Sequence, residues 1–173
     1  MVRLPLRQCV LRPWRYGDEP ALAREANDRE IWRALRDRFP HPYTLEAAAM
    51  WVASTLGVDP PQQLAIEVDG EVAGGVGLYR GDDVHRYSAE VGYWLGRRHW
   101  GRGIATEALT AFTAWAFTTF DLGRLYASAF ATNPASGRVL AKAGYRLEGI
   151  ARAGAFKDGR FVDVAVYARL RTD

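Results

Sequence analysis

Two glycines and several arginines stand where the chain passes from a strand-like segment into a helix-like one. Residues 92–109 read GYWLGRRHWGRGIATEAL, which places Gly101 and Gly103 just before the helix, beside Arg98 and Arg102. A helix start presents unpaired backbone N–H groups and the positive end of the helix dipole. Glycines there let a ligand approach the backbone and permit a positive φ angle. The stretch is therefore either an anion-binding loop or an ordinary tight turn.

Two widespread phosphate-binding motifs do not fit this loop. A Walker A loop ends in Gly-Lys followed by Ser or Thr, whereas residues 101–104 read Gly-Arg-Gly-Ile. A dinucleotide-binding fingerprint needs a third glycine where Thr106 stands, an early βαβ unit, and an acidic residue at the end of the following strand. We therefore expect neither a Walker-type nucleotide nor a dinucleotide.

The elements that must position this loop are predicted from periodicity and turn signals. A strand is expected over 88–95 and a helix from about 103 to 120, whose apolar residues keep helical spacing. Asp-Gly pairs at 69–70 and 158–159 each join two alternating strands, which predicts hairpins. The order is a strand, helices, three strands, a helix, a strand, a helix and two strands. This order predicts a mixed α/β domain around one sheet. The expected segments outside the loop are 8–14, 19–28, 44–55, 64–79, 124–130, 133–144 and 145–170.

Capping residues mark several helix ends. Asp18 and Thr44 have side chains that N-cap positions favour. Pro134 suits the first turn of a short helix that Gly144 would end.

Composition and length are those of a globular protein, with 49% hydrophobic and 25% charged residues among 173. This length predicts a single domain over 1–173 with room for a buried core. The longest nearly apolar run, ALTAFTAWAFTTF, is too short and too rich in threonine to span a bilayer. The beginning of the chain lacks the apolar core of a signal peptide. We expect a cytoplasmic protein without a membrane partner.

The inventory of reactive and charged side chains argues against several kinds of site. Cys9 is the single cysteine and the three histidines lie far apart in sequence, so we expect no disulfide and no metal site. The net charge of +3 comes almost wholly from arginine, which suits an anionic ligand because it binds phosphate bidentately. The arginines are scattered among acidic residues without a basic run, so we expect no nucleic-acid binding.

The pattern Arg98-x-x-Gly101-x-Gly103-x-Ala105 resembles the acetyl-CoA pyrophosphate loop of the GNAT N-acetyltransferase superfamily. The segments LRPW, EVGYWL, NPASGRVLAKAGYRLEG and DGRFVDVAVYARL are similar, in the same order, to its RimJ/RimL-like branch. That branch acetylates the N-terminal amines of ribosomal proteins and other primary amines. The resemblance implies an α/β GNAT fold: a single mixed, mostly antiparallel sheet, splayed at the cofactor site and flanked by helices on both faces.

The resemblance also implies where acetyl-CoA, the cosubstrate, would bind. The pantetheine arm pairs with the strand backbone near Trp94 and Leu95, and the pyrophosphate lies on the loop amides, with Arg98 and Arg102 adding charged contacts. Asn133 matches the family asparagine that contacts the amide arm, unless it only caps a helix. The implied cofactor-binding residues are Trp94, Leu95, Arg98, Trp100, Gly101, Arg102, Gly103, Ile104, Ala105, Asn133 and Ser136.

For catalysis, the resemblance implies direct acetyl transfer in a ternary complex, with Glu90 and Ser136 as the catalytic residues. Glu90 either takes the proton of the amine or is a strand residue on a solvated face, and Asp163 and Glu148 are weaker candidates. Many members of the superfamily place a tyrosine acid where Leu140 stands, whereas the RimJ/RimL-like pattern has serine at 136. Ser136 either hydrogen-bonds the departing thiolate or bonds to the helix-start backbone.

Two alternatives stay open at the level of sequence. A GNAT-fold domain that binds acetyl-CoA as a sensor or scaffold, without turnover, would carry the same loop. The acceptor is an amine-bearing peptide or a small molecule, such as a polyamine or an antibiotic, and residues 18–56 with the C-terminal hairpin are expected to select it. Trp32, Phe39 and Trp51 either line the acceptor site or belong to the core. A monomer or a homodimer is usual in this branch.

Overall fold

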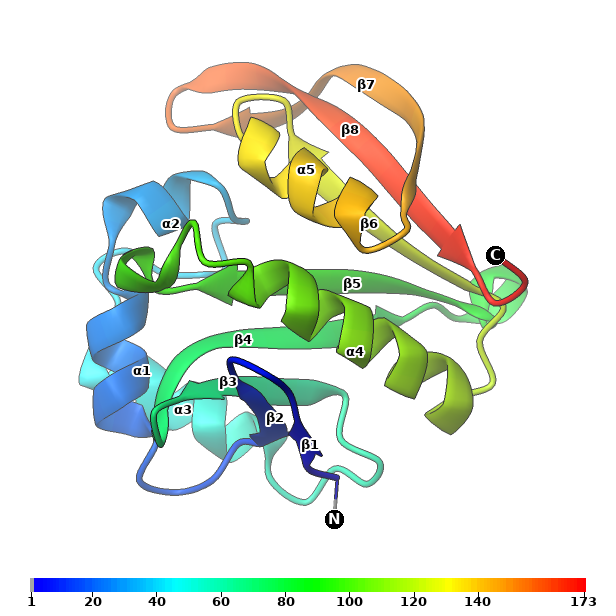
Figure 1. The fold of residues 1–173 in the computed structure, drawn as a ribbon. Coiled ribbons are helices and arrows are strands. Elements are labelled where there is room, and N and C mark those ends of the chain that lie inside the picture. The colour runs from blue at the N-terminus through cyan, green and yellow to red at the C-terminus, as the bar shows by residue number, and fades with distance from the viewer. Residues whose placement is uncertain (1) are drawn as a thin grey trace.

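The computed structural model describes residues 2–173, which form one sheet of eight strands and five α-helices (Figure 1). The strands are β1 (Leu4–Pro5), β2 (Val10–Pro13), β3 (Gln63–Val68), β4 (Glu71–Arg80), β5 (Ser88–Leu95), β6 (Arg124–Phe130), β7 (Arg146–Lys157) and β8 (Arg160–Leu170). The helices are α1 (Glu19–Ala26), α2 (Arg29–Arg33), α3 (Leu45–Thr55), α4 (Ile104–Thr119) and α5 (Pro134–Lys142), with short 3₁₀ turns η1 (Asp83–His85) and η2 (Arg97–His99).

The sheet is mixed, mostly antiparallel, and split near its middle. Its strand order is β1-β2-β3-β4-β5-β6-β8-β7, and the pairing of β5 with β6 is its parallel step. That pairing covers only residues 88–90 against 124–126, whereas β5 stays with β4 to Leu95 and β6 stays with β8 to Phe130. The β6–β8–β7 part therefore rises away from β5 on the side where α2 lies (Figure 1). The expected splayed sheet is confirmed.

Helices cover both faces of the sheet because its strands alternate between two cores. On β3, Leu64 and Ile66 point into one core, which they share with Phe112 of α4. Ala65, between them, points into a second core with Val52 of α3. The first core takes in α4 and α5 and the second takes in α1 and α3.

Two tight turns follow from their Asp-Gly sequences. Asp69 and Gly70 have φ angles of 51° and 84°, and Asp158 and Gly159 have φ angles of 52° and 77°. A two-residue hairpin turn with positive φ at both positions matches the twist of its strands, and Asp-Gly accepts this conformation at low cost. Both predicted hairpins, β3–β4 and β7–β8, are confirmed.

The two predicted helix caps have different outcomes. Thr44 caps α3, and its hydroxyl accepts a hydrogen bond of 3.1 Å from the N–H of Ala47. Asp18 occupies the N-cap position of α1 but makes no capping bond. Its carboxylate instead accepts two bonds of 2.8 Å from Arg12, a buried side chain that also binds Glu67. A buried guanidinium needs paired carboxylates, and this need outweighs capping.

Two short elements were not predicted. α2 has five residues, and the carboxylate of Asp28 caps it by accepting from the N–H of Glu30 at 2.8 Å. The two-residue strand β1 precedes β2, which is shorter than the expected strand at 8–14. Helices and strands this short carry too little periodicity to be recognised in a sequence, and their stability comes from tertiary packing.

Candidate active site

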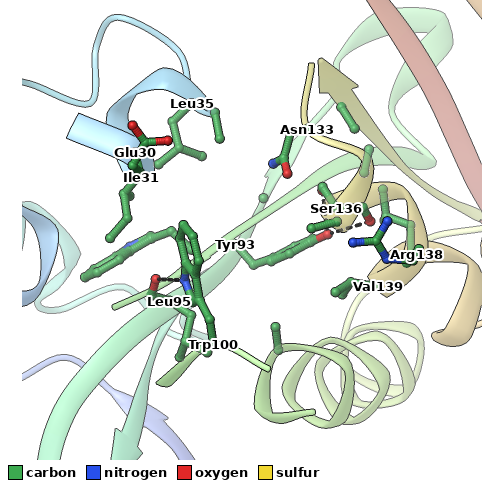
Figure 2. A pocket seen from close by; sticks show the side chains of 18 of the residues that line it. Glu30, Ile31, Leu35, Tyr93, Leu95, Trp100, Asn133, Ser136, Arg138 and Val139 are labelled. Carbon is green, nitrogen blue, oxygen red and sulfur yellow. Dashed lines mark hydrogen bonds between the residues drawn. The ribbon is translucent and has the colours of Figure 1, made fainter. Parts of the chain in front are cut away.

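A cavity of about 690 Å³ lies across the gap between β5 and β6 (Figure 2). The loop that leads into α4 and the beginning of α5 form one side, and α2 with the β7–β8 turn forms the other. The structure thus brings together segments that are far apart in the chain, from Glu30 to Val162. The predicted cofactor-binding residues that line it are Trp94, Leu95, Trp100, Gly101, Gly103, Ile104, Ala105, Asn133 and Ser136.

The glycine loop has the backbone geometry of an anion site. Gly101 and Gly103 have φ angles of 73° and 80°. Residues other than glycine rarely adopt such positive φ angles. Gly103 is the N-cap of α4 and no side chain caps the helix there. The first-turn N–H groups, which include those of Ile104 and Ala105, have no acceptor within the helix and belong to residues that line the cavity. The loop can therefore offer several amide donors to one anion.

The two arginines expected beside the anion lie outside the cavity lining. Arg98 is held 2.6 Å from the carboxylate of Glu25, which is buried on α1. Arg102 lies 3.5 Å from Nδ1 of His99, which is buried beneath the loop. Burial and the charge of Arg98 lower the pKa of His99, so its neutral form is favoured. Contact of either arginine with a ligand stays a prediction.

Two cations on α5 were missed by the sequence reasoning. Arg138 and Lys142 are four residues apart, one helical turn, and both line the cavity. Within residues 2–173 neither makes an ion pair, in contrast to most of the arginines near α1 and α2. Their i, i+4 spacing in NPASGRVLAKAG was the available signal, since it places both on one face of the helix.

The edge of β5 that faces the gap is only partly occupied. The ladder with β6 ends at Glu90, so the gap-facing edge of residues 91–94 has no strand partner. The carbonyl of Leu95 accepts a hydrogen bond of 2.7 Å from the indole N–H of Trp100, a half-exposed side chain (Figure 2). A ligand that pairs with this strand finds free backbone groups before Leu95, and it reaches the Leu95 carbonyl only if Trp100 turns away.

Asn133 and Ser136 both line the cavity, and their roles toward a ligand stay predictions. Asn133 is the N-cap of α5, yet its side chain makes no capping bond, and its amide points into the cavity (Figure 2). The phenol oxygen of Tyr93 lies 2.7 Å from the Ser136 hydroxyl and 3.2 Å from the Ser136 carbonyl oxygen. Burial raises the pKa of Tyr93 to about 12. Tyr93 was not among the predicted site residues, so this partnership was missed.

The three candidate bases lie outside the cavity lining. Glu90 sits at the last rung of the β5–β6 ladder, is mostly buried, and pairs with Arg36. Glu148 accepts two bonds of 2.6 Å from Arg124, which lowers the pKa of Glu148. Asp163 accepts from a backbone N–H of β7 at 2.8 Å. Of the three, Glu90 is the one at the point where the gap begins.

Ion pairs join α2 to the β7–β8 turn on the far side of the cavity. Asp158 in the turn accepts bonds of 2.9 and 3.0 Å from Arg29 and lies 3.6 Å from Arg33. Arg33 also pairs with Glu30 at 3.2 Å, and Glu30 lines the cavity (Figure 2). A helix that the sequence did not predict thus lines the far side of the cavity.

Trp32, Phe39 and Trp51, considered above for the acceptor site, pack against other side chains outside the large cavity. Trp51 belongs to the second core, and Phe39 packs edge-on against Trp94 with ring centroids 5.6 Å apart. Trp32 lies beneath Lys157, whose ammonium is 3.7 Å from the ring centroid. None of Trp32, Phe39 and Trp51 lines the large cavity.

Residues 2–173 contain neither a metal-binding cluster nor a helix that could span a membrane. No group of three or more His, Cys, Asp or Glu side chains is arranged to hold a metal ion. No helix is long and apolar enough to cross a membrane.

Comparison with known families identifies the fold. Residues 8–146 match the family model described as an acetyltransferase (GNAT) domain, so the chain belongs to the GNAT acetyltransferase family. The RimJ protein of Mycobacterium smegmatis, solved in complex with CoA-disulfide, is 26% identical and superposes with a TM-score of 0.86, covering 98% of this chain and 87% of that one. The predicted family membership is confirmed.

Characterised relatives differ in what they acetylate. The phosphinothricin N-acetyltransferase of Streptomyces coelicolor is 33% identical over 133 residues, or 74% of this chain and 77% of that protein. The ribosomal-protein-serine acetyltransferase of Escherichia coli is 35% identical over 83 residues, or 48% of this chain and 46% of that protein. The chain spans about half the length of most of the curated relatives it matches.

Proposed function

We propose that this chain is an acetyl-CoA-dependent N-acetyltransferase that transfers an acetyl group to a primary amine by direct attack in a ternary complex. We further propose that residues 1–173 act as one domain. The observation that carries the proposal is the cavity across the sheet. The glycine loop and α5 open on one side of it, and α2 with the β7–β8 turn opens on the other. Two reactants entering from these sides meet at the gap, which supplies the orientation that direct transfer needs.

The first side suits the thioester cosubstrate. Its pyrophosphate would lie on the amides around Gly103, and Arg138 and Lys142 would supply positive charge nearby. The pantetheine arm would follow the free edge of β5, with Asn133 at its amide groups. This arrangement leads the thioester to the region between β5 and Ser136.

The reaction then needs three contributions from the chain. The amine attacks the thioester carbonyl, and the oxygen that gains negative charge meets N–H donors on the free edge of β5. The sulfur that leaves is stabilised by the hydroxyl of Ser136. Glu90 accepts the proton of the amine through a bridging water, since its carboxylate lies at the beginning of the gap but outside the lining.

We propose a peptide N-terminal α-amine as the acceptor. An α-amine has an ordinary pKa of about 7.7 to 8.0, so much of it is neutral near pH 8, whereas a lysine amine near 10.4 is almost wholly charged. An α-amine therefore needs only a weak base, which suits Glu90 because its carboxylate is paired with Arg36. The ribosomal-protein-serine acetyltransferase among the relatives is consistent with this acceptor.

Release of free CoA thiol tests the function. Purified protein is mixed with acetyl-CoA and, separately, with peptides bearing free N-termini, the same peptides with blocked N-termini but free lysines, polyamines, and phosphinothricin. We expect turnover with free N-termini alone. Turnover restricted to a small amine would refute the peptide acceptor but keep the enzyme. Binding of acetyl-CoA by calorimetry without turnover on any amine would favour the sensor or scaffold instead.

A further inference from the structure

Tyr93 connects β5 to α5 within the cavity. It projects from β5 toward the first turn of α5, and its phenol oxygen lies 2.7 Å from the hydroxyl of Ser136 and 3.2 Å from the Ser136 carbonyl (Figure 2). An O–H···O bond is usually 2.7–2.8 Å long, so the contact between the two hydroxyls is the closer to ideal. The hydroxyl of Ser136 is therefore held by a side chain from another element.

Counting hydrogens shows what this contact does for Ser136. Each hydroxyl has one hydrogen to donate and can accept bonds as well. When Tyr93 donates to the Ser136 oxygen, the hydrogen of Ser136 is free for a third group in the cavity. When Ser136 donates to Tyr93 instead, Tyr93 donates to the backbone carbonyl at 3.2 Å and Ser136 has no hydrogen left for another partner. The distance of 2.7 Å between the two hydroxyls suits either arrangement. A thiolate in the cavity favours the first, because only there does Ser136 have a hydrogen to donate to it.

Burial keeps Tyr93 in the form that can donate. It raises the pKa of the phenol to about 12, so the phenol keeps its proton throughout the neutral range. A neutral phenol also polarises the hydroxyl to which it donates, and this strengthens the bond that the hydroxyl donates in turn. A pair of hydroxyls of this kind suits a hydrogen-bond acceptor, such as a leaving sulfur, whose negative charge appears only during the reaction.

We propose that Tyr93 is a positioning residue that orients the Ser136 hydroxyl toward the sulfur that leaves the thioester. The proposal rests on the function proposed above. In the step concerned, the amine nitrogen forms its bond to the carbonyl carbon, the carbon–sulfur bond breaks, and its electron pair leaves on sulfur. The amine proton passes to Glu90 or water, and the thiolate, stabilised by the hydrogen bond that Ser136 donates, then takes a proton from solvent. The products are the N-acetyl amine and the CoA thiol.

The chain contains a matched control for this pair. Tyr145 is buried, whereas Tyr93 is partly buried. The pKa of Tyr145 is also raised to about 12, and its phenol oxygen lies 2.7 Å from the hydroxyl of Thr113. Neither Tyr145 nor Thr113 lines the cavity. Tyr145→Phe therefore removes the same kind of phenol–hydroxyl hydrogen bond as Tyr93→Phe, from a more buried place outside the cavity.

The test is a double-mutant cycle in single turnovers, so that product release does not mask the chemical step. Tyr93→Phe should lower the rate of transfer about 2- to 10-fold, the effect of one neutral hydrogen bond, and leave acetyl-CoA affinity unchanged. Ser136→Ala should lower it about 10- to 100-fold, the effect of a bond to a charged sulfur. The double variant should match Ser136→Ala alone, because Tyr93 acts through Ser136. Tyr145→Phe should show a similar drop in Tm to Tyr93→Phe but the wild-type rate.

Each contrary outcome has one meaning. A wild-type rate for Tyr93→Phe overturns the assignment, and so does a double variant whose losses multiply, since Tyr93 would then act independently of Ser136. An equal loss of rate in Tyr145→Phe also overturns it, because the cause would be general loosening of the core. A wild-type protein that transfers acetyl to no amine overturns the proposed function and this assignment together, whereas the other outcomes leave the proposed function standing.

Discussion

Replacing Gly103 by valine places a branched side chain at the N-cap of α4, where the backbone has a φ angle of 80°. The nearest atom to the new Cβ would be Nε2 of Gln8 at 3.8 Å, so the protein itself leaves room for the side chain. The cost to folding is therefore the strain of a left-handed residue, about 1–3 kcal/mol. For a chain of this length each kcal/mol lowers Tm by about 2–4 °C.

The variant should also weaken ligand binding, because in the proposed binding mode the new side chain stands between the loop amides and the pyrophosphate. Losing two charge-assisted hydrogen bonds of about 1.5 kcal/mol each corresponds to a more than 100-fold weaker affinity for acetyl-CoA. Isothermal calorimetry measures this directly, without any acceptor amine.

Gly57→Val is the matched control. Gly57 has a φ angle of 76° and an equally open Cβ position, but it follows α3 and does not line the cavity. Both variants should lose similar Tm, and only Gly103→Val should lose affinity. Unchanged acetyl-CoA affinity in a folded Gly103→Val protein, or an equal loss in both variants, would refute the assignment of the loop as the anion site.

Further predictions concern charge and pH. Arg138→Gln should weaken acetyl-CoA binding about 2- to 5-fold, and the difference from wild type should shrink at high salt. Arg152→Gln, outside the cavity, should leave the affinity unchanged. Equal effects of the two substitutions would contradict a contact between Arg138 and phosphate. Glu90→Gln should cut kcat/KM up to about 10²–10⁴-fold at low pH and recover partly as the amine becomes neutral, whereas superimposable pH–rate profiles rule out Glu90 as the base. Because the pKa of His99 is lowered on folding, the unfolded chain binds more protons and stability falls as pH drops through about 6.5. The Tm of His99→Gln should therefore decline less than wild type between pH 7.5 and 5.5, and that of the exposed His85→Gln should follow wild type; equal declines in both variants contradict the assignment.

Features that depend on neighbours in sequence were predictable. The Asp-Gly turns, the Thr44 cap and the apolar stripe of α4 follow from the dihedral preferences and periodicity of a few adjacent residues. The glycine loop belongs to this group too, because Gly101 and Gly103 permit its positive φ angles by themselves. A turn and a helix start are local structures, so their sequence is sufficient to predict them.

Features that depend on where distant segments meet were decided by the tertiary structure. The Asp18 carboxylate binds the buried Arg12 and does not cap the helix. Arg98 pairs with Glu25 on α1. Neither outcome can be read from local pattern, since a charged side chain takes the partner that burial supplies.

The site shows the same division. Sequence alone determined which residue types were present: glycines before a helix, an asparagine and a serine at the beginning of another, and a glutamate in the strand before the loop. The tertiary structure decided that β5 and β6 separate after three residue pairs. It also decided that α2 lines the far side of the cavity and that Tyr93 reaches Ser136 across the gap. These relations join residues far apart in the chain. They form only when the whole sheet twists and packs, because pairing between distant strands is set by the two cores and not by any short stretch of sequence.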